Sequence, residues 1–383
     1  MIVSTASPRP LHPPTRPLRV VLDLEKLRHA NCGLGRFCRH LADGLLALRQ
    51  PAIEPVLFAS RDAVRGYRAE GVAHIEASPW RKEAVARLYR PLVARWIPRC
   101  HDLWHVTNQT SKYLPLDPRV PVVLTIHDLN FLHDQRHRGR PQAVARKLAA
   151  VQRKIDRSAA IVTDSRFVAA DVEAHLRLGS RPIHVVPPGV APPVPAAEAP
   201  PAFAPREPFL LSVGNALPHK NFHALFGLLE RLPDHALVIA GKCDTPYGAA
   251  LAREVAARNL GGRVVMPGQV TDADRQWLYE RCAAFVFPSL AEGFGFPVLE
   301  AMQCGRPVFM ARRTSLPEVA GDLGFYWDSF DPDHMHEVYA AGLRAVAADR
   351  RFADKCRGRA ASFSWEATVR GYLAVNAATR AAA

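Results

Sequence analysis

Two glutamates bracket a glycine-bearing loop in the second half of the chain. Residues 285–300 read FVFPSLAEGFGFPVLE, with seven residues between Glu292 and Glu300. The apolar start predicts a buried strand, and Pro297 suits the first turn of a helix because its missing N–H is not needed there. Loop amides and the positive end of a helix attract anions. A carboxylate beside them is costly unless it faces another group, and its two oxygens can hold a vicinal diol.

This segment resembles the signature of the retaining glycosyltransferases of family 4. The resemblance rests on the two glutamates, their spacing and the Gly-Phe-Gly-Phe-Pro run between them. It implies that Glu292 lies by the donor sugar and acts in catalysis, and that Glu300 holds the nucleotide ribose. The loop itself would contact the donor through Gly293, Phe294 and Gly295. The alternative is a strand-to-helix turn with two solvated glutamates.

A second candidate segment, residues 214–221, reads GNALPHKN and precedes a predicted helix. A lysine at this place can reach a diphosphate, and such a charged hydrogen bond contributes about 1.5–3 kcal/mol. The resemblance implies a basic pair on the donor phosphates, and Lys220 matches its lysine, with a part in catalysis. Asn215 stands where the family has an arginine, so the distal phosphate must be neutralised in another way, with His219 as a candidate. Gly214 and Asn215 are predicted to contact the donor.

The loop between the first predicted strand and helix reads NCGLGR over residues 31–36. A dinucleotide-binding fingerprint would need a third glycine where this chain has Cys38. The resemblance implies instead that Gly33 and Gly35 let the backbone approach the donor. A tight turn without a ligand is the alternative.

Polar residues also follow two predicted strands of the first half. The resemblance implies that His127 lies close to the reacting sugar and acts in catalysis, whereas its neighbour Asp128 is expected to point elsewhere. Ser165 either caps the next helix or lines a cleft that binds the substrates, where Arg166 would meet an anionic acceptor. Residues 315–319, SLPEV, resemble a late loop of the family and are expected to play a supporting role.

Strands and helices alternate along the chain. Apolar runs predict the strands, and helical patterns such as 35–48, 143–158 and 167–178 lie between them. This alternation predicts parallel sheets covered by helices on both faces. The predicted strands are 19–24, 55–59, 103–106, 122–126, 160–163, 183–186, 209–213, 236–240, 264–266, 284–287 and 308–310.

Composition divides the chain into two halves, because nine of residues 187–208 are proline and proline-rich chain is stiff and cannot join a sheet. The sequence therefore predicts an α/β protein of two doubly wound Rossmann-like domains facing a central cleft, and the resemblance implies the GT-B architecture. The predicted parts are a disordered tail at 1–16, an N-terminal acceptor-side domain at 17–187, a Pro-rich linker at 188–208, a C-terminal nucleotide-sugar-binding domain at 209–362 and a C-terminal helix at 363–383 that returns to the N-terminal domain.

The charge balance favours anionic partners. Lys and Arg number 50 against 36 Asp and Glu, a formal net charge of +14, which suits nucleotide-sugars, phospholipid surfaces or nucleic acid. No nucleic-acid-binding module or stacking platform is recognised, so we expect no nucleic acid. The 7 cysteines form no C-x-x-C pair and no cluster at zinc spacing, which favours a reducing compartment. We expect no cofactor and no metal, since lysine and backbone amides would carry the charge.

Residues 80–99 interleave six basic side chains with Trp, Leu, Tyr and Val. They predict either a helix that lies on an anionic membrane or an ordinary helix with a solvated basic face, interrupted near Pro91. No apolar run approaches the 18 residues of a spanning helix, and residues 1–19 have no secretion signal. We expect a cytoplasmic protein with peripheral contact at the inner face of the membrane.

These features predict a hexosyltransferase-like enzyme that moves a sugar from a nucleoside diphosphate to an acceptor hydroxyl. The resemblance implies retention of the anomeric configuration and a place in bacterial polysaccharide or lipopolysaccharide assembly. It favours GDP-mannose as donor and a lipid-linked saccharide as acceptor. Two alternatives stay open: a dinucleotide-binding oxidoreductase of the NAD(P) type, which the missing third glycine disfavours, and a catalytically inactive sugar-nucleotide binder.

Overall fold

A computed structural model describes residues 16–29, 33–48, 50–93, 95–97, 100–133 and 140–383. The chain divides into two compact units. The first unit comprises Met1–Thr125, Arg157–Ala160 and Leu373–Ala383, and the second comprises Ile126–Asp156 and Ile161–Tyr372. The predicted tail at 1–16 lies outside the described residues apart from Arg16, whose guanidinium pairs with Asp102.

The first sheet contains seven described strands in the order β3-β2-β1-β4-β5-β6-β7. Neighbouring strands run parallel, and Val20 of β1 lies opposite Pro55 of β2 on one side and Leu103 of β4 on the other. The strands are β1 (Leu18–Asp23), β2 (Ile53–Ala59), β3 (His74–Glu76), β4 (Leu103–Val106), β5 (Val122–Ile126), β6 (Ala160–Thr163) and β7 (Ile183–Val185). Sequence reasoning missed β3, because this short edge strand is half-exposed and carries no apolar run.

The helices of this half begin and end close to the predicted positions, apart from a short helix at Arg65–Ala69 that was not predicted. They are α1 (Gly33–Leu48), α2 (Arg65–Ala69), α3 (Glu83–Val93), α4 (Pro141–Arg157) and α5 (Arg166–His175). In α1 the buried residues Phe37, Leu41 and Leu45 recur every four residues and so form one apolar face. The predicted interruption near Pro91 is wrong, since α3 continues through this proline to Val93.

The second sheet has six described strands in the order β10-β9-β8-β11-β12-β13, and its neighbouring strands also run parallel. Its strands are β8 (Phe209–Val213), β9 (Ala236–Ala240), β10 (Val264–Gly268), β11 (Ala284–Phe287), β12 (Val308–Ala311) and β13 (Gly324–Trp327). Its helices are α6 (Ala224–Glu230), α7 (Pro246–Ala257), α8 (Asp272–Arg281), α9 (Phe296–Gln303), α10 (Leu316–Ala320), α11 (Pro332–Ala348) and α12 (Phe352–Ala361). The half-buried edge strand β13 was not predicted.

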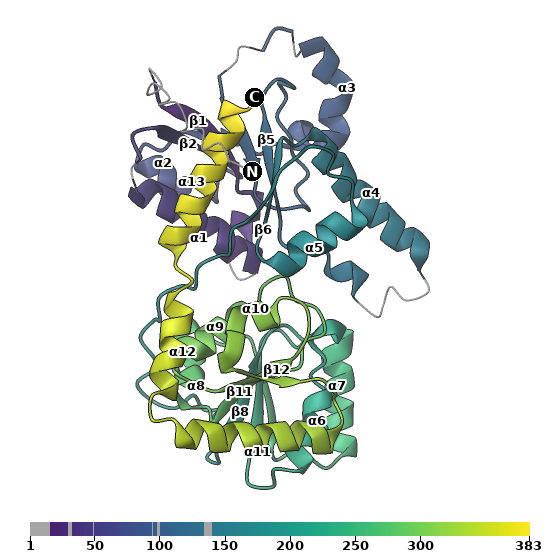
Figure 1. The fold of residues 1–383 in the computed structure, drawn as a ribbon, viewed down its shortest axis with the longest axis vertical. Coiled ribbons are helices and arrows are strands. Elements are labelled where there is room, and N and C mark those ends of the chain that lie inside the picture. The colour runs from purple at the N-terminus through teal and green to yellow at the C-terminus, as the bar shows by residue number, and fades with distance from the viewer. Residues whose placement is uncertain (1–15, 30–32, 49, 94, 98–99, 134–139) are drawn as a thin grey trace, which may run out of the picture. The chain divides into compact units, whose positions relative to one another are not determined.

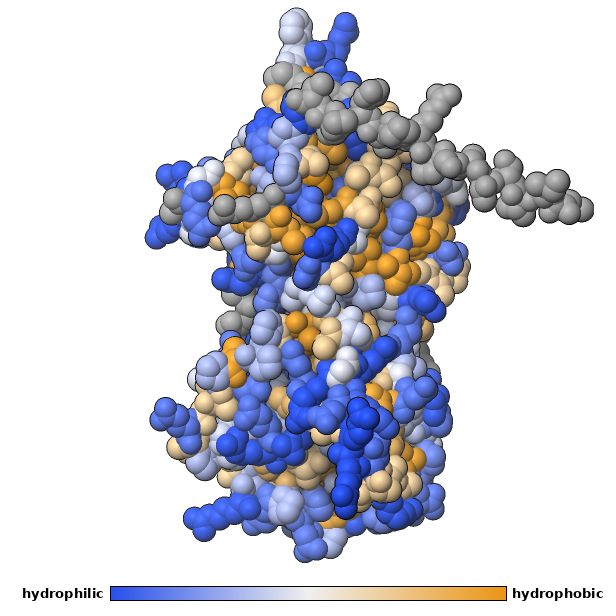
Figure 2. All heavy atoms as spheres, turned by 60° about the vertical axis from the view of Figure 1, so that its left-hand side comes forward, coloured by the Kyte–Doolittle hydropathy of each residue, from blue (hydrophilic) through white to orange (hydrophobic). Residues whose placement is uncertain are grey.

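The second sheet is covered on both faces, as the prediction of a doubly wound fold requires. Leu237 and Ile239 of β9 face one apolar core, whereas Val238 between them faces the other. Helices α6 and α7 lie on one side of the sheet, and α8, α9 and α12 lie on the other (Figure 1). In the lower part of Figure 2, the face that is drawn exposes mainly hydrophilic side chains.

The strand order of both sheets contains a topological switch point, which is where sheets of this kind bind ligands. The order reverses between β1 and β4 in the first sheet and between β8 and β11 in the second, and ligands of such sheets bind outside the carboxyl ends of the strands at that point. The last helix, α13 (Trp365–Ala381), begins where predicted, with the Ser364 hydroxyl accepting from the amide of Ala367 at 3.1 Å. No helix in the described ranges is long and apolar enough to cross a membrane.

Candidate active site

The switch point of the second sheet brings together Lys220 and Glu292. The loop after β8 carries the lysine and the loop after β11 carries the glutamate, and the amide of Leu290 donates to the carbonyl of His219 at 2.8 Å, which joins the two loops. Lys220 Nζ lies 2.5 Å from Glu292 Oε1, and both side chains are largely buried. The sequence analysis predicted that the lysine binds the donor phosphates and that the glutamate lies by the donor sugar. It did not predict that the two residues form an ion pair.

The backbone and an aromatic ring hold Lys220 in place. The lysine ends a short 3₁₀ turn, Pro218–Lys220, and the next residue, Asn221, has a left-handed conformation with φ of +58°. The ammonium group lies 5.1 Å from the ring centre of Phe287 at the end of β11, a distance at which a cation is attracted to the face of the ring. The charge is therefore fixed above the carboxyl ends of β8 and β11.

The loop that carries Glu292 is tied down by the late loop predicted to support it. Ser315 donates its hydroxyl to the carbonyls of Glu292 and Phe294 at 3.1 and 2.9 Å. The amide of Glu292 donates to Thr314 Oγ1 at 3.1 Å, so this amide is already used inside the protein. These bonds fix the path of the loop before any substrate arrives.

Two other predicted residues of this loop serve its conformation. Gly295 precedes α9 with φ of +118°, and a Cβ atom there would lie 2.9 Å from the side chain of Leu316, so only glycine fits. The Phe294 side chain is 5% exposed and lies between Phe296 and Phe363. Phe294 therefore belongs to the core, and only its backbone can contact a donor.

Adjacent strands of the first sheet bring His127 and Asp164 together. The histidine follows β5 and the aspartate follows β6, and His127 Nδ1 lies 2.7 Å from Asp164 Oδ2. Both residues are at least 95% buried. Sequence reasoning missed Asp164, although two polar residues that follow neighbouring parallel strands must lie near each other. A carboxylate at this distance fixes the orientation and tautomer of an imidazole.

The His127 pair and the Glu292 loop meet within the second unit. A Cβ atom on Gly293 would lie only 2.1 Å from the carbonyl oxygen of His127, so the glycine allows this close approach. Ser165 caps α5 by accepting from the amide of Val168 at 3.2 Å, and its hydroxyl also lies 3.1 Å from the carbonyl of Gly293, to which it donates. The predicted capping role of Ser165 is confirmed, and the residue also fixes the loop.

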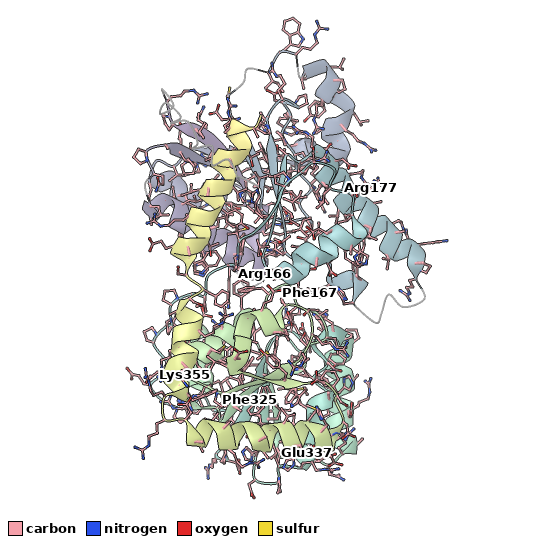
Figure 3. The ribbon with its side chains drawn as sticks, viewed as in Figure 1. Arg166, Phe167, Arg177, Phe325, Glu337 and Lys355 are labelled. Carbon is pink, nitrogen blue, oxygen red and sulfur yellow. The ribbon has the colours of Figure 1, made fainter. Side chains whose placement is uncertain are left out.

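A carboxylate occupies the N-terminus of α5. Arg166 and Phe167 begin α5 (Figure 3). Their amides donate to the carboxylate of Glu318 in α10 at 2.9 and 2.6 Å. A negative charge at a helix N-terminus contributes about 0.3–1 kcal/mol. The exposed Arg166 side chain was predicted to meet an anionic acceptor, which stays a prediction.

Asp128, which was expected to point elsewhere, accepts from the amide of Asn130 through its Oδ1 at 3.0 Å. Burial raises the pKa of the Asp128 carboxyl group, the Asn130 amide and His127 lower it, and the carboxylates of Asp164 and Glu292 raise it further. The folded chain therefore keeps this proton to a higher pH than the unfolded chain does. Ionisation of Asp128 lowers the free energy of unfolding as the pH rises above the ordinary carboxyl range.

Two further predicted residues of the second half are Glu300 and Asn215. Glu300 is in α9, partly exposed, with its Oε2 accepting from the hydroxyl of Tyr279. Asn215, at the family's arginine position, accepts from the amide of Lys242 at 3.2 Å. This bond places a further lysine beside Gly214 and Asn215.

The two predicted glycines of the first unit lie in the first turn of α1. A Cβ atom on Gly35 would lie 2.0 Å from the carbonyl oxygen of His29, whereas a Cβ on Gly33 would meet nothing within 4 Å. Gly35 is thus required for packing, and a contact of either glycine with the donor stays a prediction.

The described residues include no group of three or more His, Cys, Asp or Glu arranged to hold a metal ion. Two segments have Asp-x-Asp spacing, and both start helices. Asp272 forms an ion pair with Arg275 at 2.6 Å, and Asp274 interacts with the Thr271 cap of α8. Asp331 caps α11 by accepting from the amides of Asp333 and His334. These contacts give the carboxylates structural roles.

Two family models match successive halves of the chain. The model described as Glycosyltransferase Family 4 matches residues 32–192, and the model described as Glycosyl transferases group 1 matches residues 195–362.

Curated relatives match part of the chain. A "Serotype-specific mannosyltransferase WbdA" of Escherichia coli is 34% identical over 178 residues, which is 45% of this chain. An "O-antigen chain mannosyltransferase B" of Escherichia coli is 34% identical over 168 residues, which is 41% of this chain. The matched parts are 22% and 42% of those relatives' own lengths, so the chain spans less than half of either.

Solved structures share the fold at low sequence identity. A sucrose-phosphate synthase from Thermosynechococcus elongatus superposes with a TM-score of 0.71 at 18% identity, covering 96% of this chain and 100% of that chain. This likeness shows the GT-B fold alone, whereas the two family models show the family. The chain therefore belongs to the glycosyltransferases, with a family 4 domain in its first half and a group 1 domain in its second.

Proposed function

We propose that this protein transfers a sugar from a nucleoside diphosphate to an acceptor hydroxyl, with retention of the anomeric configuration and without a metal ion. The observation that carries the proposal is the Lys220–Glu292 ion pair at a switch point, beside the buried His127–Asp164 pair. A lysine at this place supplies positive charge for a diphosphate, and the glutamate supplies acceptors for sugar hydroxyls.

The bond from the anomeric carbon to the diphosphate oxygen breaks, and the diphosphate leaves with the electron pair. The acceptor oxygen attacks from the same face, and its proton passes to the leaving phosphate. Lys220 stabilises the negative charge that grows on the diphosphate, by preorganised electrostatics. The carboxylates of Glu292 and Asp164 both lie close enough to Asp128 to affect its pKa, and their negative charge favours the positive charge that develops on the sugar ring.

The favoured donor is GDP-mannose, because the two Escherichia coli relatives carry names of mannosyltransferases. The favoured acceptor is a lipid-linked saccharide in bacterial surface polysaccharide assembly, which the O-antigen relative supports. The backbone amide of Lys242 binds Asn215, and we propose that the Lys242 side chain, which pairs with Asp244 at 3.4 Å, shares the charge of the distal phosphate in place of the family's arginine.

A panel of nucleotide-sugars tests the proposed reaction. Thermal unfolding with each donor should show one or two that stabilise the protein, by about 2.7 kcal/mol at 100 times the dissociation constant. The same donors should be hydrolysed slowly in EDTA. Complete loss of hydrolysis in EDTA, restored by manganese or magnesium, would contradict metal independence. Binding without hydrolysis or transfer to any acceptor would indicate an inactive sugar-nucleotide binder.

We further propose peripheral binding of α3 to an anionic membrane. The apolar side chains of Leu88 and Leu92, one turn apart, are each 73% exposed, and Trp96 beyond the helix is 86% exposed. The exposed Arg87 and Arg95 accompany them. A basic amphipathic helix gains about 1 kcal/mol per Lys or Arg near an anionic surface, and salt screens this gain.

The protein should therefore pellet with vesicles of phosphatidylglycerol and phosphatidylethanolamine, less with phosphatidylcholine vesicles, and partly release in high salt. The double variant Arg87→Glu/Arg95→Glu should lose most of this binding and keep donor hydrolysis. Arg90 is left unchanged, because it pairs with Glu83 inside the segment. Arg65→Glu/Arg68→Glu makes the same charge change on the exposed helix α2 and serves as the control. Equal binding to anionic and neutral vesicles would point to a soluble acceptor.

A further inference from the structure

A buried tyrosine hydroxyl is directed at the second glutamate of the signature. Tyr279 of α8 is 2% exposed, and its hydroxyl donates to Glu300 Oε2 at 2.8 Å. The ring packs against Phe285 of β11 with 5.7 Å between ring centres. A tyrosine buried in an apolar core needs a partner for its hydroxyl, and Glu300 supplies it at the edge of the core.

An arginine from the same helix approaches the same carboxylate oxygen. Arg275 precedes Tyr279 by four residues, so the two side chains share one face of α8. Arg275 Nε lies 3.8 Å from Glu300 Oε2, and its guanidinium is held in turn by Asp272 at 2.6 Å. One oxygen of Glu300 therefore faces a hydrogen-bond donor and a positive charge, both of which come from α8.

These contacts fix a side chain that would otherwise be free to rotate. Ordering a glutamate side chain costs up to about 2 kcal/mol of conformational entropy. When the protein orders it beforehand, a ligand that binds the carboxylate no longer bears that cost. Burial, followed by the nearby Glu300 carboxylate, raises the pKa of Tyr279 well above its ordinary value, so the hydroxyl keeps its proton and remains a donor at any working pH.

We propose that Tyr279 is a positioning residue that holds the Glu300 carboxylate in the orientation that accepts hydrogen bonds from the ribose diol of the donor. The inference rests on the proposed function, since it requires a nucleotide with its ribose at Glu300. The contact of Tyr279 with Oε2 fixes the orientation of the whole Glu300 carboxylate group. The carboxylate held in this way distinguishes ribose, which has vicinal hydroxyls, from sugars that lack them.

Calorimetry on the full chain tests this proposal with ADP, CDP, GDP and UDP and with their 2′,3′-dideoxy forms. For the nucleotide that the wild-type protein binds most tightly, Tyr279→Phe should raise the dissociation constant by about 5- to 30-fold. The same substitution should change the dissociation constant of the matching dideoxy form by less than twofold. Tyr326→Phe is the matched control, since Tyr326 of β13 donates its hydroxyl to the backbone carbonyl of Gly321 and not to a site residue. It should change neither constant.

The other possible results contradict either the role of Tyr279 or the proposed function. If the wild-type protein binds ribo and dideoxy forms equally, or Tyr279→Phe weakens both equally, Tyr279 does not act through the ribose diol. Unchanged binding of the ribo form by a folded Tyr279→Phe variant also overturns the proposal, and thermal unfolding of the variant shows whether it is folded. If the wild-type protein binds none of the four nucleoside diphosphates, the proposed function itself is wrong.

Discussion

Replacing Lys220 by alanine should lower turnover by about 10²- to 10³-fold at saturating donor, the loss typical of removing one preorganised charge from a developing anion. The ammonium group is fixed between Glu292 and the Phe287 ring, so it needs little reorganisation when the donor binds. The negative charge that it meets grows as the bond to the diphosphate breaks. The loss should therefore appear in kcat as well as in KM.

Three further variants separate charge from packing. Lys220→Met keeps most of the aliphatic stem and should be as inactive as Lys220→Ala. Lys220→Arg should recover part of the activity, since a planar guanidinium is not a point charge. Lys355→Ala is the matched control, because this exposed lysine also pairs with a carboxylate, Asp349 at 2.7 Å. Normal turnover by Lys220→Ala would show that another group holds the diphosphate, with Lys242 the first to test.

Replacing Asp164 by asparagine should lower kcat/KM by about 10- to 100-fold, which corresponds to a lost or misaligned charged hydrogen bond of roughly 1.5–3 kcal/mol. An asparagine of the same shape can present an NH₂ group to His127 Nδ1 and so impose the other tautomer. The imidazole would then offer the wrong hydrogen-bonding group to the reacting sugar, although its position is unchanged.

A double-mutant cycle distinguishes positioning from a general structural effect. If Asp164 acts through His127, the variant His127→Ala/Asp164→Asn should be no less active than His127→Ala alone. The control is Asp171→Asn, since Asp171 forms the same kind of pair, with His133 at 2.6 Å, in the same unit. Additive losses in the cycle would show that Asp164 merely supports the fold.

The sequence sufficed for the local elements of this protein. Apolar runs bounded by proline and glycine located β5, β9 and β11 at the residues where the structure has them, because a strand buried on both faces needs a continuous apolar segment. The edge strands β3 and β13 escaped this reasoning, since half-exposed edge strands need no such run. The start of a helix could be predicted where a capping residue or a proline marks it, as Ser165 and Pro297 do.

The sequence by itself also determined the candidate residues of the second half, because their types and spacing lie within single segments. Which of them meet was decided by tertiary structure alone. Lys220 and Glu292 are 72 residues apart, and Asp164 is 37 residues from His127. These pairs form because parallel strands end at one edge of a sheet, and the order of the strands sets which ends are neighbours. No local pattern encodes that order, so Asp164, Tyr279 and the Lys220–Glu292 ion pair became visible only in the folded chain.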